Sequence, residues 1–157
     1  MDVRRATPED TEALIAMGQA MHAESPRYQG MRFDPAKLRR LAEYLQGTLL
    51  VQPGLVLVAV QGGELVGMFV AVLSERWFSA DRFVSELAVY VKPEHRGGTA
   101  FVRLVRTMER WALAQGVPDS ALGVSTGIHP GRTVRAYRKL GYRLGGYTMT
   151  KNLRDGH

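Results

Sequence analysis

The residues that most clearly suggest a ligand-binding function are two glycines that follow an arginine, Arg96-Gly97-Gly98. Glycine has no side chain and adopts backbone angles that other residues avoid, so a ligand can approach the amides of such a turn closely. The sequence from Thr99 and Ala100 onward predicts the first turn of a helix, whose unpaired N–H groups favour an anion. Arg96 adds a permanent charge that can bind a phosphate through two N–H groups. A tight connection between a strand and a helix is the simpler alternative.

This segment resembles the acetyl-CoA pyrophosphate loop of the GNAT superfamily of N-acetyltransferases, whose pattern is Arg/Gln-x-x-Gly-x-Gly/Ala between a strand and a helix. The chain has His95-Arg96-Gly97-Gly98-Thr99-Ala100 at this place, with His95 where Arg or Gln is usual. We expect Arg96 to supply the charge instead. The resemblance extends from residues 3–10, which are similar to the family's first strand and helix start, to residues 136–142, which are similar to its last helix.

Glu86 is the candidate general base. A lysine-like amine with a pKa near ~10.4 is almost fully protonated at pH 7, so a base helps an amine to attack a thioester. Glu86 lies within an apolar strand segment, where a carboxylate is costly unless it is paired or functional. Strict alternation would place it on one face with Val84, Ala88 and Tyr90. Exposure to solvent or an ion pair with Arg82 is an equally open alternative.

The resemblance implies that Tyr137, the first residue of Tyr-x-x-x-Gly-Tyr, stands beside the CoA sulfur and protonates the departing thiolate. A tyrosine of the hydrophobic core is the alternative. The resemblance also implies that the backbone of Val89 and Val91 pairs with the pantetheine amides as an added strand. We expect Arg138 and Lys139 to reach the 3′-phosphate, although both could be exposed helix charges.

Two segments lack a firm assignment from sequence. The family often has an asparagine early in its last helix, where this chain has His129-Pro-Gly-Arg-Thr133. The link between the first two helices commonly covers the acceptor site in this family, and a plain surface loop is the alternative. Its candidate lid residues are His22, Glu24, Tyr28, Arg32 and Phe33. His22 has no partner at metal-ligand spacing, so we predict no metal.

The composition predicts one domain with a sizeable core, because the chain has 157 residues of which 45% are hydrophobic. The absence of cysteine excludes disulfides, thiolate metal sites and an acetyl-cysteine intermediate. No leader pattern and no apolar run near the ~20 residues of a membrane helix are found. We therefore expect a soluble cytoplasmic protein.

The net charge of +6 is concentrated in one half of the chain. Residues 1–80 hold 8 Lys/Arg against 9 Asp/Glu, whereas residues 81–157 hold 13 against 6. A polyanionic cofactor would explain this local excess, and a nucleic-acid-binding protein would more often interleave basic residues with exposed aromatics. DNA binding that survives saturating CoA would favour the nucleic-acid alternative.

Periodicity and turn signals predict a single α/β domain over residues 1–157. We expect a helix that starts from a cap at Thr7 and a hairpin turn at Gln61-Gly62-Gly63-Glu64. The expected strands cover residues 3–6, 55–60, 65–73, 83–91 and a buried 121–125, the later helices cover 35–47, 99–115 and 132–140, and residues 142–153 form a final hairpin. This order predicts a mixed, mostly antiparallel sheet with helices on both faces, as in the GNAT fold.

These features predict a CoA-dependent N-acetyltransferase that moves an acetyl group from acetyl-CoA to a primary amine of a small molecule or a protein. The transfer would be a direct attack in a ternary complex. A noncatalytic acyl-CoA-binding module on the same fold is the main alternative, and the presence of Glu86 and Tyr137 argues against it. The resemblance also implies a homodimer that pairs through the C-terminal strands.

Overall fold

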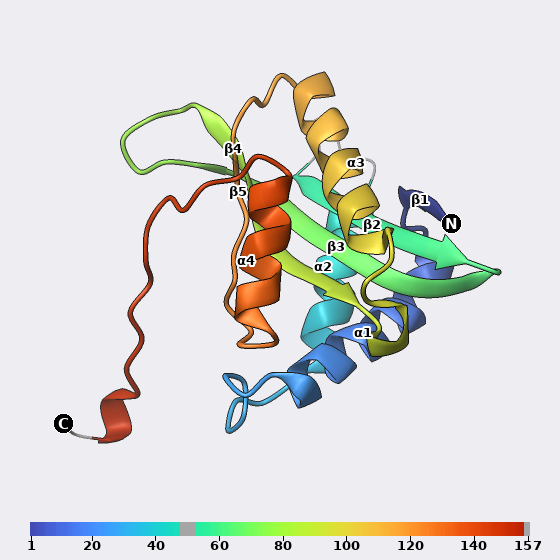
Figure 1. The fold of residues 1–157 in the computed structure, drawn as a ribbon, viewed down its shortest axis with the longest axis horizontal. Helices are drawn as coiled ribbons and strands as arrows, with labels where there is room; N and C mark the ends of the chain where they lie inside the picture. Colours follow the sequence, from blue (N-terminus) through green and yellow to red (C-terminus); the bar gives the residue numbers. More distant parts are fainter. Residues whose placement is uncertain (48–52, 156–157) are drawn as a thin grey trace.

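The order of helices and strands confirms the predicted fold class. The computed structural model describes residues 1–47 and 53–155 (Figure 1). The elements in chain order are β1 (Asp2–Arg5), α1 (Thr11–Glu24), α2 (Pro35–Gln46), β2 (Gly54–Gln61), β3 (Glu64–Glu75), β4 (Arg82–Val91), α3 (Ala100–Ala114), β5 (Ser120–Ala121) and α4 (Pro130–Lys139). Short 3-10 helices cover Pro8–Asp10, Pro93–His95 and Leu153–Asp155.

The sheet has the strand order β1-β2-β3-β4-β5. The first four strands are antiparallel neighbours, and β5 is parallel to β4. The predicted hairpin between β2 and β3 is confirmed, with Gln61 opposite Glu64. A parallel neighbour needs a crossover connection, and α3 supplies it between β4 and β5.

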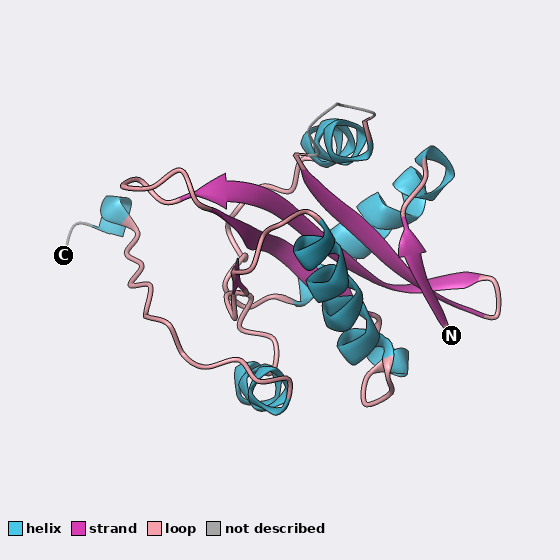
Figure 2. Cartoon of the chain, turned by 90° about the horizontal axis from the view of Figure 1, so that it is seen from above, coloured by secondary structure: helices cyan, strands magenta, loops and turns pink. Residues whose placement is uncertain are grey.

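Helices cover both faces of the sheet, and each face has its own core (Figures 1 and 2). On one face, Leu104 and Met108 of α3 pack with Phe69 and with Tyr137 of α4. On the other face, Leu14 of α1 and further residues of α1 and α2 pack against β2, β3 and β4. Burial of each such large apolar side chain contributes about 1.5–3 kcal/mol to the free energy of folding. Strand β4 is therefore fixed by packing on both of its faces.

Local signals explain most helix boundaries. Asp34 caps α2, because its Oδ1 accepts hydrogen bonds from the amides of Ala36 at 3.0 Å and Lys37 at 3.3 Å. The predicted cap at Thr7, followed by Pro8, is present, but it precedes a short 3-10 turn and not the α-helix itself. Residues Pro8–Asp10 form a 3-10 turn, and α1 itself begins at Thr11.

A bulge in β4 overturns the predicted alternation of side chains around Glu86. Val70 lies opposite Ala88 and Ala71 lies opposite Glu86, so Leu87 has no partner on β3. One extra residue moves every later side chain to the opposite face of the sheet. As a result, Val84 shares its core with Val89 and Val91, whereas Ala88 and Tyr90 pack in the other core.

The C-terminal part of the predicted sheet is also corrected. The buried strand expected at residues 121–125 is reduced to Ser120–Ala121, and residues 123–125 are exposed. No strand is assigned between residues 142 and 153, so the predicted final hairpin is wrong. A hairpin needs a third strand or a hydrophobic face to pack against, and a two-residue β5 offers little of either.

Candidate active site

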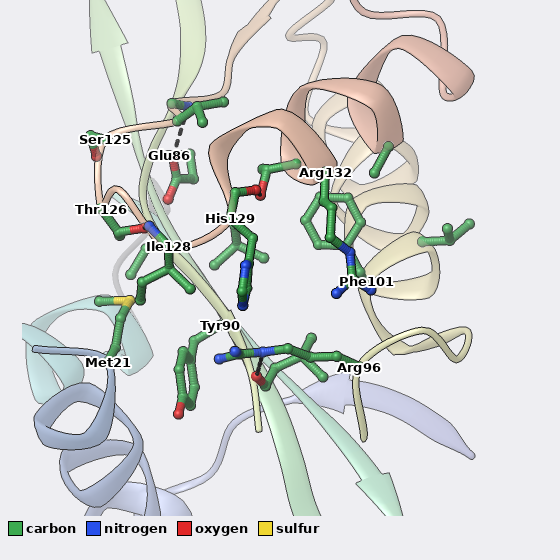
Figure 3. Close-up of a pocket in the computed structure, with 18 of the residues that line it drawn as sticks. Met21, Glu86, Tyr90, Arg96, Phe101, Ser125, Thr126, Ile128, His129 and Arg132 are labelled. Atoms are coloured by element: carbon green, nitrogen blue, oxygen red, sulfur yellow. Dashed lines mark hydrogen bonds between the residues drawn. The ribbon is translucent and has the colours of Figure 1, made fainter. Parts of the chain in front are cut away.

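A cavity opens where β4 and β5 separate. These strands pair only at Val84 with Ser120 and at Ser85 with Ala121, and beyond this point the chain after β5 turns away from β4. The space between them is a cavity of about 270 Å³. Its walls are residues 86–91 of β4, the turn at residues 95–98, the start of α3, residues 123–129 and the first turns of α4 (Figure 3).

The end of the cavity formed by residues 95–100 is named the turn end. The predicted Gly97-Gly98 turn lies here, between the 3-10 helix that ends at His95 and α3, which begins at Ala100. Gly97 has a φ of +85°, a left-handed conformation that favours glycine. Among the described residues, no acceptor is bonded to the N–H of Gly97 or Gly98. The turn end therefore offers amide donors to an anion.

Arg96 lines the turn end, but its guanidinium is already engaged by the protein. Its Nη1 and Nη2 donate to the two carboxylate oxygens of Glu24 at 2.5 and 2.7 Å, and its Nε donates to the carbonyl of Val91 at 2.9 Å. The guanidinium carbon also lies 5.4 Å from the ring centre of Tyr90. The sequence predicted that Arg96 binds a phosphate, and it did not indicate the ion pair with Glu24.

Glu86 lies at the opposite end of the cavity, the Glu86 end, together with Gly123 (Figure 3). The amide of Gly123 donates to Oε2 of Glu86 at 2.9 Å. Burial raises the pKa of Glu86 to about 7, and the hydrogen bond from Gly123 opposes this shift only in part. The alternative partner Arg82 donates to the carbonyl of Gln115 instead. A carboxylate with a pKa near neutrality in a cavity has the properties of a general base.

Tyr137 is buried beside the cavity, behind its lining. Its ring packs against Phe101 at 5.2 Å and Tyr142 at 5.6 Å, while its neighbours Thr133 and Ala136 line the cavity. Burial raises its pKa above the usual range, with a further contribution from the charge of Glu86. Its hydroxyl has no hydrogen-bond partner among the described residues. An unpaired buried hydroxyl costs about 1–3 kcal/mol and asks for an explanation.

The backbone of β4 faces the cavity at the residues predicted to hold pantetheine. The amide of Lys92 donates to Val66 on β3, so in an extended strand the polar groups of Val91 and Val89 point to the opposite edge, where β5 is absent. The contact between Arg96 and the Val91 carbonyl agrees with this direction. The bulge at Leu87 and the early end of β5 together expose this edge.

The structure does not bring Arg138 and Lys139 to the cavity. Both are exposed on α4, and neither is a lining residue. Arg132, in the first turn of α4, lines the cavity instead, and it makes no hydrogen bond or ion pair with any described residue. His129 precedes it with a φ of +43°. A left-handed non-glycine residue at a cavity is a functional signal, and the sequence did not assign a role to His129 or Arg132.

None of the five predicted lid residues lines the cavity, although Glu24 pairs with the cavity residue Arg96. His22 stacks on Tyr28, contacts the ring of Phe33 and bonds to the Met31 carbonyl at 2.8 Å. The residues that follow α1 are nevertheless tied to the cavity wall, because Oγ of the fully buried Ser25 donates to the Thr126 carbonyl at 2.5 Å. Arg32 is exposed.

Residues 1–47 and 53–155 contain no group of three His, Asp or Glu side chains that could hold a metal ion. No helix in the same ranges is both long enough and apolar enough to cross a membrane.

Comparison with known proteins adds a family and a fold. The profile of the acetyltransferase (GNAT) family matches residues 18–142, and no curated protein sequence gives a match. A tetramutant of the BH1408 protein from Bacillus halodurans superposes with a TM-score of 0.76 at 21% identity, over 97% of this chain and 99% of that chain. An aminoglycoside acetyltransferase from an uncultured soil metagenomic sample gives 0.70 at 21% identity, over 96% and 97%. AAC(6')-Iy, in complex with the bisubstrate analogue CoA-S-monomethyl-acetylneamine, gives 0.73 at 16% identity, over 96% of each chain.

Proposed function

Because the chain belongs to the GNAT family of acetyltransferases, which use acyl-CoA, we propose that it transfers an acetyl group from acetyl-CoA to a primary amine by direct attack in a ternary complex. The cavity itself carries this proposal. Its turn end presents unpaired amides at the start of α3, and its Glu86 end presents a carboxylate with a pKa of about 7. One end suits the pyrophosphate of a CoA, and the other suits the deprotonation of an amine.

The residues between these ends fit the remaining part of the cofactor. The open edge at Val89 and Val91 supplies backbone groups for the pantetheine amides. Arg132 is a cation that lines the cavity and has no partner among the described residues. The amides of Gly97 and Gly98 and the start of the helix at Thr99 and Ala100 would hold the pyrophosphate. A cofactor held in this way would direct its acyl thioester toward Glu86.

The proposed reaction uses Glu86 and Tyr137 at the Glu86 end. Glu86 accepts a proton from the ammonium group, and the freed nitrogen lone pair forms a bond to the thioester carbonyl carbon. The carbon–sulfur bond then breaks, and the thiolate takes a proton from the Tyr137 phenol. The nitrogen loses its surplus proton as the amide forms, and this proton restores the phenol through solvent, while Glu86 releases its own proton to solvent. Burial keeps Tyr137 protonated, which a general acid requires.

We propose only the class of the acceptor, a primary amine of a small molecule or a protein. Apolar side chains also line the cavity, including Met21, Leu87, Val124 and Ile128. Glu86 is the one acidic residue among the lining residues that the structure describes. The solved structures with the same fold include an aminoglycoside acetyltransferase, which makes aminoglycosides one class to test. Cytoplasmic location and a homodimer stay predictions from the sequence.

A turnover screen tests the proposal. Acetyl-CoA is supplied with polyamines, aminoglycosides, amino acids or peptide N-termini, and the CoA thiol that is released is measured with a thiol-reactive dye. The chain has no cysteine, so the dye reports the product without a protein background. Turnover that depends on the amine, with an acetylated product found by mass spectrometry, supports the proposal. Tight CoA binding without turnover of any amine would favour the noncatalytic module.

A further inference from the structure

The two arginines at the cavity differ in what they contact, and this difference suggests a division of roles. Arg96 is held at Glu24 and Val91, whereas Arg132 has no partner among the described residues. We propose that Glu24 and Arg96 form a brace that positions the Gly97-Gly98 turn, and that Arg132 is the side-chain cation that contacts the phosphates of the acyl-CoA. This inference rests on the proposed function.

The geometry of Arg96 is that of a structural contact. Its side chain is 20% exposed and that of Glu24 is 29% exposed, so the pair is largely shielded from solvent. Two parallel N–H to carboxylate bonds form the strong, planar arrangement that arginine favours. A phosphate that recruited this guanidinium would have to displace Glu24 and leave a carboxylate beside its own negative charge.

The brace joins three parts of the chain that meet at the turn end. Glu24 is the last residue of α1, Val91 is the last residue of β4, and Arg96 immediately precedes Gly97. The hydrogen bonds from Arg96 therefore fix the start of the turn relative to both elements. Tyr90 lies beside the guanidinium and limits its movement. A turn held in this way presents its amides in one direction, and a ligand does not have to order it.

Arg132 has the opposite properties. It is exposed and lines the cavity from the α4 side, and Figure 3 shows it on the same side of the cavity as Phe101. A phosphate can bind its guanidinium without breaking an existing ion pair. Arg138 and Lys139, which the sequence suggested for this role, are on α4 but outside the cavity lining.

Calorimetric titration with CoA tests the brace, because the brace and a direct phosphate contact predict opposite changes in the CoA affinity of Glu24→Gln. Glu24→Gln should weaken CoA binding by about three- to tenfold, because the turn loses its anchor. If Arg96 held the phosphate directly, the same change would free the guanidinium, and CoA binding would be unchanged or tighter. Such a result would overturn the proposal. Glu12→Gln is the matched control, since Glu12 is also an α1 acid paired with an arginine, Arg39 at 2.6 Å, and CoA binding should not change.

A double-mutant cycle sharpens the test. Arg96→Gln should weaken CoA binding by about tenfold or more, because Glu24 is left unpaired near the phosphates. The double variant Glu24→Gln/Arg96→Gln should bind no more weakly than Arg96→Gln alone, since both changes remove one contact. Additive losses would contradict the brace. In turnover assays, Glu24→Gln should raise the KM for acetyl-CoA and leave kcat nearly unchanged.

Acetyl-pantetheine has no nucleotide phosphates. Comparing its affinity with that of CoA therefore isolates the effect of an arginine variant on phosphate binding. Arg132→Gln should weaken CoA binding by about tenfold and leave acetyl-pantetheine binding unchanged, whereas Arg138→Gln should affect neither. Unchanged CoA binding by Arg132→Gln would overturn the role of Arg132. Retained acetyl-pantetheine binding also shows that each variant is folded at the cavity. If the unmodified protein bound no CoA at all, the proposed function would fail together with this inference.

Discussion

The two ends of the cavity are built from different parts of the chain. The turn end uses consecutive residues, 95–100, together with the start of the helix that follows them. The Glu86 end uses Glu86 of β4, Gly123 after β5 and, behind the lining, Tyr137 of α4. Backbone donors dominate the first end, and a desolvated carboxylate dominates the second.

This contrast separates binding from chemistry. Backbone amides bind an anion equally before and after bond breaking, so the turn end should determine the affinity for CoA. An acid–base group acts while protons move, so the Glu86 end should determine kcat. Each prediction below concerns one end, and an effect on the other parameter would break the comparison.

The largest expected effect is on binding at the turn end. We expect Gly98→Asp to weaken CoA binding by more than about 100-fold, because a carboxylate would meet the pyrophosphate at the amides that should hold it. The space beside Gly98 is ordinary, since an added Cβ would lie 3.5 Å from the His95 carbonyl, so the fold should persist. Calorimetric titration measures the loss. Gly145→Asp, at an open position, is the control, and near-normal affinity of Gly98→Asp would remove the turn from the site.

Glu86→Gln should lower kcat by about 10²–10³-fold, within the range typical of a lost general base, and change the CoA affinity little. In the unmodified protein, kcat/KM for the acceptor should rise about tenfold per pH unit below a pKa of about 7 and level off above it. The variant should lack this dependence. An unchanged pH profile in Glu86→Gln would assign the base to another group.

The raised pKa of Glu86 also predicts the direction of a stability change. The folded pKa of about 7 lies above the reference value of 4.5, so the folded state favours the protonated acid. Stability from this group is complete below pH 4.5 and is lost as the pH rises through 7. Thermal melts should therefore show that Glu86→Gln gains more relative to the unmodified protein at pH 8 than at pH 5.

Tyr137→Phe should lower kcat by about 10²-fold with little change in the KM for acetyl-CoA. The effect should lie at the lower end of acid catalysis, because a thiol with a pKa near ~8.5 is already a fair leaving group. The same change should leave the protein as stable or slightly more stable, since it removes a buried hydroxyl that no described residue pairs with. Tyr142→Phe, whose hydroxyl lies 3.3 Å from Ser120, is the matched control. Full activity of Tyr137→Phe at saturating substrates would make Tyr137 a packing residue.

The smallest expected effect is at the partner of Glu86. A Cβ added at Gly123 would lie 3.2 Å from Oε2 of Glu86, so Gly123→Ala should shift the carboxylate by a few tenths of an ångström. We expect a severalfold loss in kcat/KM for the acceptor and an unchanged CoA affinity. Steady-state kinetics and titration test this together. A weakened CoA affinity would show that the two ends are not separable.

Much of the fold could be predicted because its signals are local. The cap at Asp34, the glycines of the β2–β3 hairpin and the apolar face of α3 each depend on a few neighbouring residues. The segment after β5 could not be predicted in the same way. Its residues lie in a loop that Ser25 binds through Thr126, and this contact spans about two thirds of the chain.

The sequence by itself indicated the Gly97-Gly98 turn and the start of α3, since these residues are contiguous and their types favour a turn before a helix. Only the tertiary structure decided the rest of the site. The bulge at Leu87 sets the face of Glu86, and the early separation of β5 leaves the edge of β4 open. The partner of Arg96 is Glu24, 72 residues away. Such contacts depend on how distant elements pack, and short-range patterns of residue type carry no information about them.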